Sequence, residues 1–181
     1  LDLKNSKFTA FGMTKKSGRS AENDPGLSAI MNSNTESVCL VGKTWDFHVD
    51  VALGISNEEN LENIKETTKH FVKNDKEFMF DAEHFFDGYK SNPTYALECI
   101  KAAYDNGAKW IVLCDTNGGT LPHEVTKIAH ALDNLGVDYI EGGWPGANPS
   151  DTEFFQKGLD LKNSKFTAFG MTKKSGRSAE N

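Results

Sequence analysis

Short apolar segments alternate with longer amphipathic segments along most of the chain, and this alternation limits the possible folds more than any other feature. Six short runs, rich in β-branched or aromatic residues and bounded by Gly or Asp, are typical of strands. These predicted strands are Phe8–Met13, Ser37–Gly42, Phe78–Ala82, Trp110–Cys114, Tyr139–Gly142 and Phe166–Met171. Strands that alternate with helices form right-handed βαβ units around a parallel sheet. We therefore predict an α/β fold of parallel βα repeats.

The longer segments have the spacing of amphipathic helices. The predicted helices run from Ser56 to Val72, from Pro93 to Tyr104 and from Pro122 to Leu135. The first begins at Ser56-Asn57-Glu58-Glu59, which resembles a capping box. Residues 14–35 are polar and rich in Ser and Asn, so we expect a long loop there with one short helix near Leu27–Met31.

Residues 1–23 recur without change at residues 159–181, an offset of 158. Structural repeats normally diverge in sequence, so perfect identity over the whole segment indicates a recent duplication, a recombination joint or a circular assembly artefact. A deliberately permuted or capped domain is the alternative. Both interpretations place the same predicted strand at both ends of the strand order.

Length and composition fit one ordinary globular domain, and we predict a single α/β domain over residues 1–181. The net charge of −6 argues against a nucleic-acid partner, because such binding depends on Lys and Arg contacting phosphates. No apolar run approaches the roughly 20 residues that span a bilayer, so we expect no membrane partner.

Three cysteines without a close pair suit a reducing, cytoplasmic location. The chain begins without Met, which suggests a fragment or a clipped chain.

Polar residues gather after the predicted strands, at the carboxyl ends where α/β proteins bind ligands. Glu83 is placed to act as a general base, and the hydroxyl of Thr116 suits a carboxylate substrate. The other candidates are Asp115, Asn117 and Glu141 for substrate binding, Asp87 as a helix N-cap, and Asp46, His48 and Asp50 as a weak metal triad. His48 would point away from the two aspartates if this segment is helical, so we do not expect the triad to bind metal.

Three motifs resemble a known family: CDTNGGTLP (114–122), FDAEHFFDGYKSNP (80–93) and YIEGGWPGANPSD (139–151). They are similar to segments of the metal-dependent citramalate, 2-isopropylmalate and homocitrate synthases and hydroxymethylglutaryl-CoA lyase. VGKTWDFHV (41–49) and TAFGMT (9–14) resemble the citramalate synthase type. The resemblance implies a TIM barrel that condenses acetyl-CoA with a 2-oxoacid, using a divalent metal such as Mg²⁺ or Mn²⁺.

The resemblance covers the chain in a rearranged order. Residues 1–125 resemble barrel units 3–6, and residues 128–181 resemble unit 2 followed by a second copy of strand 3. We therefore expect a partial TIM barrel with about six strands, in which the family's first, seventh and eighth strands are missing. Two unpaired edges with identical strand sequences would favour a strand-swapped homo-oligomer, in which the C-terminal copy of one molecule replaces the N-terminal copy of another.

The resemblance also implies roles for individual residues. Glu83 corresponds to the catalytic carboxylate, Thr116 to the hydroxyl that binds the substrate carboxylate, and Glu141 to a strand end that lines the same pocket. The family's metal ligands lie in a D-x-T-L-R-D-G motif and a His-x-His pair, and the sequence contains neither. We therefore expect no metal site in this chain and no activity of the chain alone. The alternative is a non-catalytic small-ligand-binding α/β domain.

Overall fold

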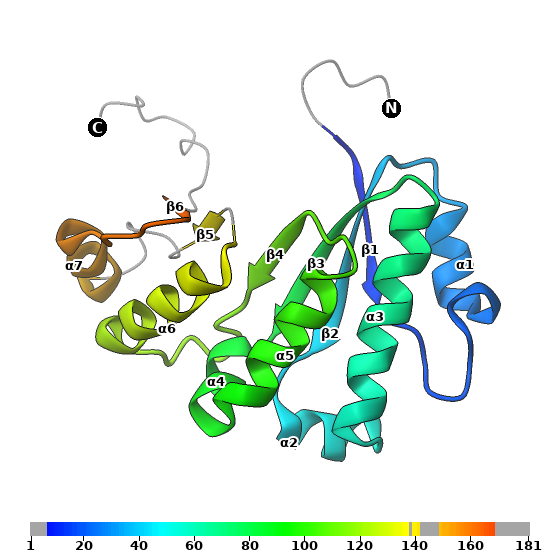
Figure 1. Ribbon diagram of the computed structural model, residues 1–181, viewed down its shortest axis with the longest axis horizontal. Coiled ribbons are helices and arrows are strands. Elements are labelled where there is room, and N and C mark those ends of the chain that lie inside the picture. The colour runs from blue at the N-terminus through cyan, green and yellow to red at the C-terminus, as the bar shows by residue number, and fades with distance from the viewer. Residues whose placement is uncertain (1–6, 138, 142–148, 169–181) are drawn as a thin grey trace, which may run out of the picture. The chain divides into compact units, whose positions relative to one another are not determined.

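The computed structural model describes residues 7–137, 139–141 and 149–168, and its contacts divide the chain into two compact units, residues 1–120 and 121–181. Unit 1 contains a four-stranded parallel sheet in the order β1-β2-β3-β4 (Figure 1). Its strands are Thr9–Met13, Ser37–Lys43, Glu77–Glu83 and Trp110–Leu113. Unit 2 contains a parallel pair, β5 (Tyr139–Glu141) and β6 (Lys165–Thr167).

The predicted α/β fold with six parallel strands is confirmed, although the described pairings form two sheets. The strands of unit 1 match their predicted segments to within two residues at each end. In unit 2, Gly142 and residues 169–171 of the predicted strands lie outside the described part of the chain.

Helices cover one face of the four-stranded sheet (Figure 1). The helices of unit 1 are α1 (Pro25–Met31), α2 (Asp46–His48), α3 (Asn57–Lys73), α4 (Phe85–Ser91) and α5 (Pro93–Tyr104), with a 3-10 turn η1 (Ala21–Asn23) and a π-helical turn η2 (Val49–Leu53). Those of unit 2 are α6 (Pro122–Leu135) and α7 (Pro149–Lys157). The long loop with one short helix before β2 is confirmed.

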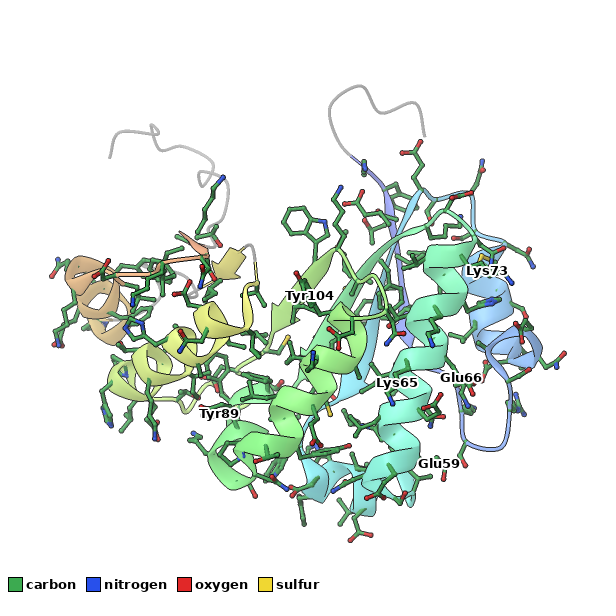
Figure 2. All side chains as sticks on the ribbon, in the orientation of Figure 1. Glu59, Lys65, Glu66, Lys73, Tyr89 and Tyr104 are labelled. Carbon is green, nitrogen blue, oxygen red and sulfur yellow. The ribbon has the colours of Figure 1, made fainter. Side chains whose placement is uncertain are left out.

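The core of unit 1 lies between the sheet and these helices because side chains alternate across the strands. Leu40 and Phe80 point toward the helices and are fully buried, as are Ile64 of α3 and Ile100 of α5. The opposite face carries Cys39, Met79 and Asp81, which are half-buried. Charged side chains such as Glu59, Lys65 and Lys73 extend from α3 (Figure 2). The amphipathic pattern therefore places α3 as the sequence predicts.

Helix α4 corrects one interpretation of the sequence. We expected Asp87 to be the N-cap of a helix that begins near Gly88, but α4 begins at Phe85 with His84 as its N-cap. Asp87 lies in the first turn, where its carboxylate contacts other side chains. In the described residues no helix is long and apolar enough to cross a membrane.

Candidate functional site

Glu83 and Lys43 form an ion pair at the carboxyl ends of β3 and β2. The register places the two residues side by side, and both point to the face of the sheet that the helices leave open. Thr44 Oγ1 donates to the carbonyl of Glu83 over 2.8 Å, and the carbonyl of Lys43 accepts from Asn60 Nδ2 over 2.9 Å. The backbone of both strand ends is therefore fixed, and an ammonium group lies beside the candidate base.

His84, directly after Glu83, connects the ends of β3 and β4. Its φ of 54° lies in the left-handed region, which residues other than Gly rarely adopt and which occurs often at functional sites. Its backbone N–H donates to Thr116 Oγ1 over 2.9 Å. Since a hydroxyl can accept and donate together, the Thr116 O–H can still donate to a ligand carboxylate. Glu83 and Thr116 thus lie at the same end of the sheet.

The neighbouring polar candidates are engaged in contacts with the protein. Asn117 Nδ2 donates to Asp87 Oδ2 over 2.9 Å, and His84 Nδ1 lies 3.2 Å from the same oxygen. The carboxylate of Asp115 accepts from the backbone N–H of Thr120 over 3.1 Å and from its hydroxyl over 2.9 Å. Asp115 therefore closes the turn after β4, and direct contact of Asp115 or Asn117 with a substrate stays a prediction.

A cluster of three aromatic rings borders the Glu83 site. The ring centroids of His48 and His84 are 4.4 Å apart, and that of Trp45 lies 4.7 Å from His48 and 5.8 Å from His84. Burial lowers the pKa of His48, and the neighbouring His84 and Lys43 lower it further. In the described part of the chain, Trp45 Nε1 and His48 Nδ1 are buried without a hydrogen-bond partner. His48 is therefore a neutral ring at pH 7 within this cluster.

The residues of the weak metal triad do not fit a metal ion. Asp46 accepts from Asn92 Nδ2 over 3.0 Å and from the backbone of Phe47, His48 packs on Trp45, and Asp50 is exposed in η2. Among the described residues no three His, Cys, Asp or Glu side chains converge as metal ligands do. The helical conformation of Asp46–His48 agrees with the expectation that His48 points away from the aspartates.

The two cysteines of the open face are protonated thiols. Burial raises the pKa of Cys39 to about 11, and burial together with the hydrogen bond to Asp81 raises the pKa of Cys114 well above its ordinary value. Cys114 Sγ donates to Asp81 Oδ1 over 2.9 Å. Because the thiolate is the reactive form, neither cysteine is a nucleophile at neutral pH.

A cavity of about 560 Å³ lies beside the ends of β1 and β2, entirely within unit 1. Leu27 and Ile30 of α1, Val41 of β2 and Ile55 form its apolar wall, and Lys43 reaches it from the Glu83 site. Such a cavity suits a small ligand that has both an apolar and an anionic part.

Glu141 ends β5 in unit 2, where its backbone pairs with Thr167. The structure thus brings Glu83 and Thr116 together and describes Glu141 separately. Sequence reasoning placed His84 at this strand end but gave it no role, and it did not identify Lys43 and Trp45 as parts of the site. Lys43 could have been identified from the sequence. Lys43 and Glu83 are each the last residue of a strand, and the alternation of side chains places both on the same face of the sheet.

Comparisons with known proteins agree with the motifs. No family model matches the chain. It is 50% identical over 128 residues to the (R)-citramalate synthase of Aquifex aeolicus, and 48% identical over 126 residues to that of Geobacter sulfurreducens. These matches cover 71% and 70% of this chain and 24% of each relative. It is also 28% identical over 116 residues to the 2-isopropylmalate synthase of Lactococcus lactis, which covers 64% of this chain and 22% of that protein.

Solved structures show the same fold at low sequence identity. The HMG-CoA lyase of Bacillus subtilis has a TM-score of 0.65 and 14% identity, with 93% of this chain and 55% of that chain covered. The HMG-CoA lyase of Brucella melitensis has a TM-score of 0.62 and 11% identity, with 90% and 56% covered. The partial α/β barrel is therefore confirmed, and so is the resemblance: the chain is similar to citramalate and 2-isopropylmalate synthases and spans about a quarter of the length of these curated relatives.

Proposed function

We propose that this chain is part of a citramalate synthase-type acyltransferase, and that it carries the catalytic carboxylate and one side of the substrate pocket. The observation that supports this best is the Glu83–Lys43 pair, which lies next to Thr116 at the carboxyl ends of β2, β3 and β4. The proposed substrates are acetyl-CoA and a 2-oxoacid. Asp115, Asn117 and Glu141 are the proposed further contacts to the substrate.

The described side chains suit these roles. The ammonium group of Lys43 forms an ion pair with Glu83, the proposed general base. The Thr116 hydroxyl accepts from His84 and retains its own proton to donate to the carboxylate of a 2-oxoacid. The side chains of Thr44 and Asn60 donate to the backbone carbonyls of Glu83 and Lys43 and hold this arrangement on rigid strand ends, as precise catalytic geometry demands.

We propose that the chain alone does not catalyse the condensation. In the family it resembles, the D-x-T-L-R-D-G motif and the His-x-His pair supply the metal ligands and an activating Arg, and this sequence contains neither motif. Loss of a single preorganised electrostatic group typically lowers kcat by about 10²–10³. Several such groups are missing together, and Glu83 alone does not stabilise negative charge on a carbonyl oxygen.

The test is release of free CoA from acetyl-CoA with pyruvate in the presence of Mg²⁺ or Mn²⁺, with a complete barrel homologue as the positive control. We expect no pyruvate-dependent release above the rate in buffer. Pyruvate-dependent release that Glu83→Gln abolishes would contradict the proposed inactivity and support the proposed role of Glu83. Release that survives Glu83→Gln would contradict both.

A non-catalytic small-ligand-binding domain is the second candidate, and the cavity beside Lys43 favours it. Calorimetry with pyruvate distinguishes the two candidates when it is run beside the CoA assay. Pyruvate binding that Thr116→Val abolishes supports the substrate pocket of the first candidate, whereas binding that Thr116→Val leaves unchanged supports a ligand in the cavity, which Thr116 does not line. The exposed hydroxyl of Thr94 on α5 provides a matched control, since Thr94→Val changes the same group away from the site.

Three broader expectations remain part of the proposal: a single α/β domain over residues 1–181, a cytoplasmic location, and a homo-oligomer formed through the repeated segment. Coincident unfolding transitions by tryptophan fluorescence and circular dichroism would support the single domain. Two separate transitions would contradict it.

A further inference from the structure

One sequence occupies two different environments in this molecule. Lys7-Phe8-Thr9 and Lys165-Phe166-Thr167 are identical copies within the 23-residue repeat. The first copy leads into β1, whose only described partner is β2. The second copy forms β6, whose described partner is β5. Of these three residues, only Thr9 of the first copy pairs with β2, whereas all three residues of the second copy pair with β5.

The phenylalanine of the two copies shows the difference most clearly. Phe8 in unit 1 is 58% exposed, and Phe11 and Met13 of β1 are also exposed, at 67% and 50%. Phe166 is half-buried, with its ring 5.5 Å from Phe154 and 4.9 Å from Phe155, both on α7. Unit 2 thus partly covers Phe166, whereas its counterpart Phe8 in unit 1 is exposed to solvent.

Unit 2 also binds the residues that precede this phenylalanine. The carboxylate of Asp133 on α6 accepts from the backbone N–H groups of Lys162, Asn163 and Ser164 over 2.8, 2.8 and 2.7 Å. We call the edge of β5, the rings of Phe154 and Phe155, and the Asp133 carboxylate the repeat-binding groove. Every residue that the groove binds has an identical counterpart in the first copy, since Lys162–Thr167 corresponds to residues 4–9.

We propose that the first copy of the repeat in one molecule binds the repeat-binding groove of a second molecule and displaces that molecule's own second copy. The existing register then places Lys7 opposite Tyr139, Phe8 opposite Ile140 and Thr9 opposite Glu141 of the second molecule. β1 pairs with β2 on one edge and with the second molecule's β5 on the other, in a parallel sheet of five strands. This exchange gives the proposed homo-oligomer a direction opposite to the one expected from the sequence, in which the second copy replaces the first, and it is independent of the proposed chemistry.

Reciprocal exchange between two molecules satisfies both grooves and gives a closed dimer. The contacts within the groove are the same before and after exchange, because the two copies are identical. Exchange gains the second edge of β1 and the burial of Phe8, and it releases the second copy from an ordered state. It must overcome the tether, which holds the second copy at an effective concentration on the order of 1 mM.

Because the two copies compete for the same groove, substitutions in the first and the second copy should have opposite effects on dimerisation. Non-specific association would not produce opposite effects. Phe8→Ala weakens the copy that joins the molecules, so we expect the dimer dissociation constant to rise about tenfold or more. Phe166→Ala weakens the tethered competitor, so we expect the constant to fall by a similar factor. Sedimentation velocity over a range of concentrations measures both. Phe47→Ala is the control, because Phe47 is 53% exposed outside the repeat and should leave the constant unchanged.

Cysteine cross-linking tests the register directly. A Thr9→Cys molecule mixed with a Glu141→Cys molecule should form a disulfide-linked heterodimer under mild oxidation. A mixture with Lys157→Cys, an exposed position at the end of α7, should not. The proposal requires both the opposite effects of the two Phe substitutions and this cross-link. A monomer at every concentration, effects of the same sign, or no Thr9–Glu141 cross-link would each overturn it.

Discussion

Gly88 shows how tightly single residues fix the Glu83 site. A Cβ at this position would lie 2.4 Å from the carbonyl oxygen of Thr44 and 2.9 Å from Cα of Trp45, so α4 approaches the end of β2 only because residue 88 lacks a side chain. Thr44 in turn holds the carbonyl of Glu83. The close approach therefore links α4 to the position of the candidate base.

We expect Gly88→Ala to lower the free energy of unfolding by about 1–3 kcal/mol, the usual cost of overpacking against rigid backbone. Urea denaturation followed by tryptophan fluorescence measures it, since Trp45 and Trp110 both lie in unit 1. Gly119→Ala is the matched control, because a Cβ there meets no atom within 4 Å and its stability should change little. Equal effects of the two substitutions would show that the contact at Gly88 has no energetic role.

At the scale of residues, sequence reasoning found side chains by type and position along the chain, and it missed their partners. Glu83 and Thr116 were identified because each follows an apolar strand. Lys43 was read as part of a motif, and its pairing with Glu83 depends on the register between β2 and β3. The left-handed φ of His84 was also missed, because a histidine gives no local signal for it.

At the scale of elements, the local patterns predicted strands and long helices well. The predicted helix Pro93–Tyr104 matches α5, and Pro122–Leu135 matches α6. The start of α4 was placed too late, and α7 was missed. α4 contains Phe85-Phe86-Asp87-Gly88, which resembles a turn, and α7 has its apolar residues Phe154 and Phe155 adjacent instead of at helical spacing. The contacts that stabilise these short helices come from distant parts of the chain.

Asp133 on α6 accepts hydrogen bonds from the backbone just before β6. These hydrogen bonds should weaken when the Asp133 carboxylate is protonated. The backbone N–H of Lys162, followed by those of Asn163 and Ser164, lowers the pKa of Asp133 to about 2 against the opposing effect of burial. A carboxylate with a depressed pKa in the folded state stabilises it above the ordinary pKa of about 3.8 and loses this contribution as the pH falls through about 2.

We therefore expect Asp133→Asn to destabilise unit 2 at pH 6, and the difference from the unsubstituted chain to shrink steadily as the pH falls from about 4 to about 2. NMR signals of Leu132 and Ile140, both buried in unit 2, follow its unfolding by urea at each pH. A difference between the two chains that stays constant over this range would show that the Asp133 charge does not hold the segment.

At the scale of the whole molecule, the sequence predicted parallel strands, while the grouping of strands into sheets came only from the structure. Local periodicity indicates that a segment is a strand, but its neighbours are chosen by contacts between residues far apart in the chain. The two copies of the repeat demonstrate this, because the first copy pairs with β2 from Thr9 onward, whereas the second pairs with β5 through Lys165–Thr167.

The two units should differ in local stability. A unit of roughly 60 residues buries only about 60% of the surface that its unfolded chain exposes, and unit 2 is of this size. Its described sheet has a ladder of three residue pairs, whereas β2 pairs on both sides and its Val38 and Leu40 are fully buried. We expect amide hydrogens of α6 to exchange at least about tenfold faster than those of β2 and β3, a difference of about 1.4 kcal/mol. Hydrogen-exchange mass spectrometry on the intact chain compares them, and equal protection of α6 and β2 would show that the small unit is as stable as the large one.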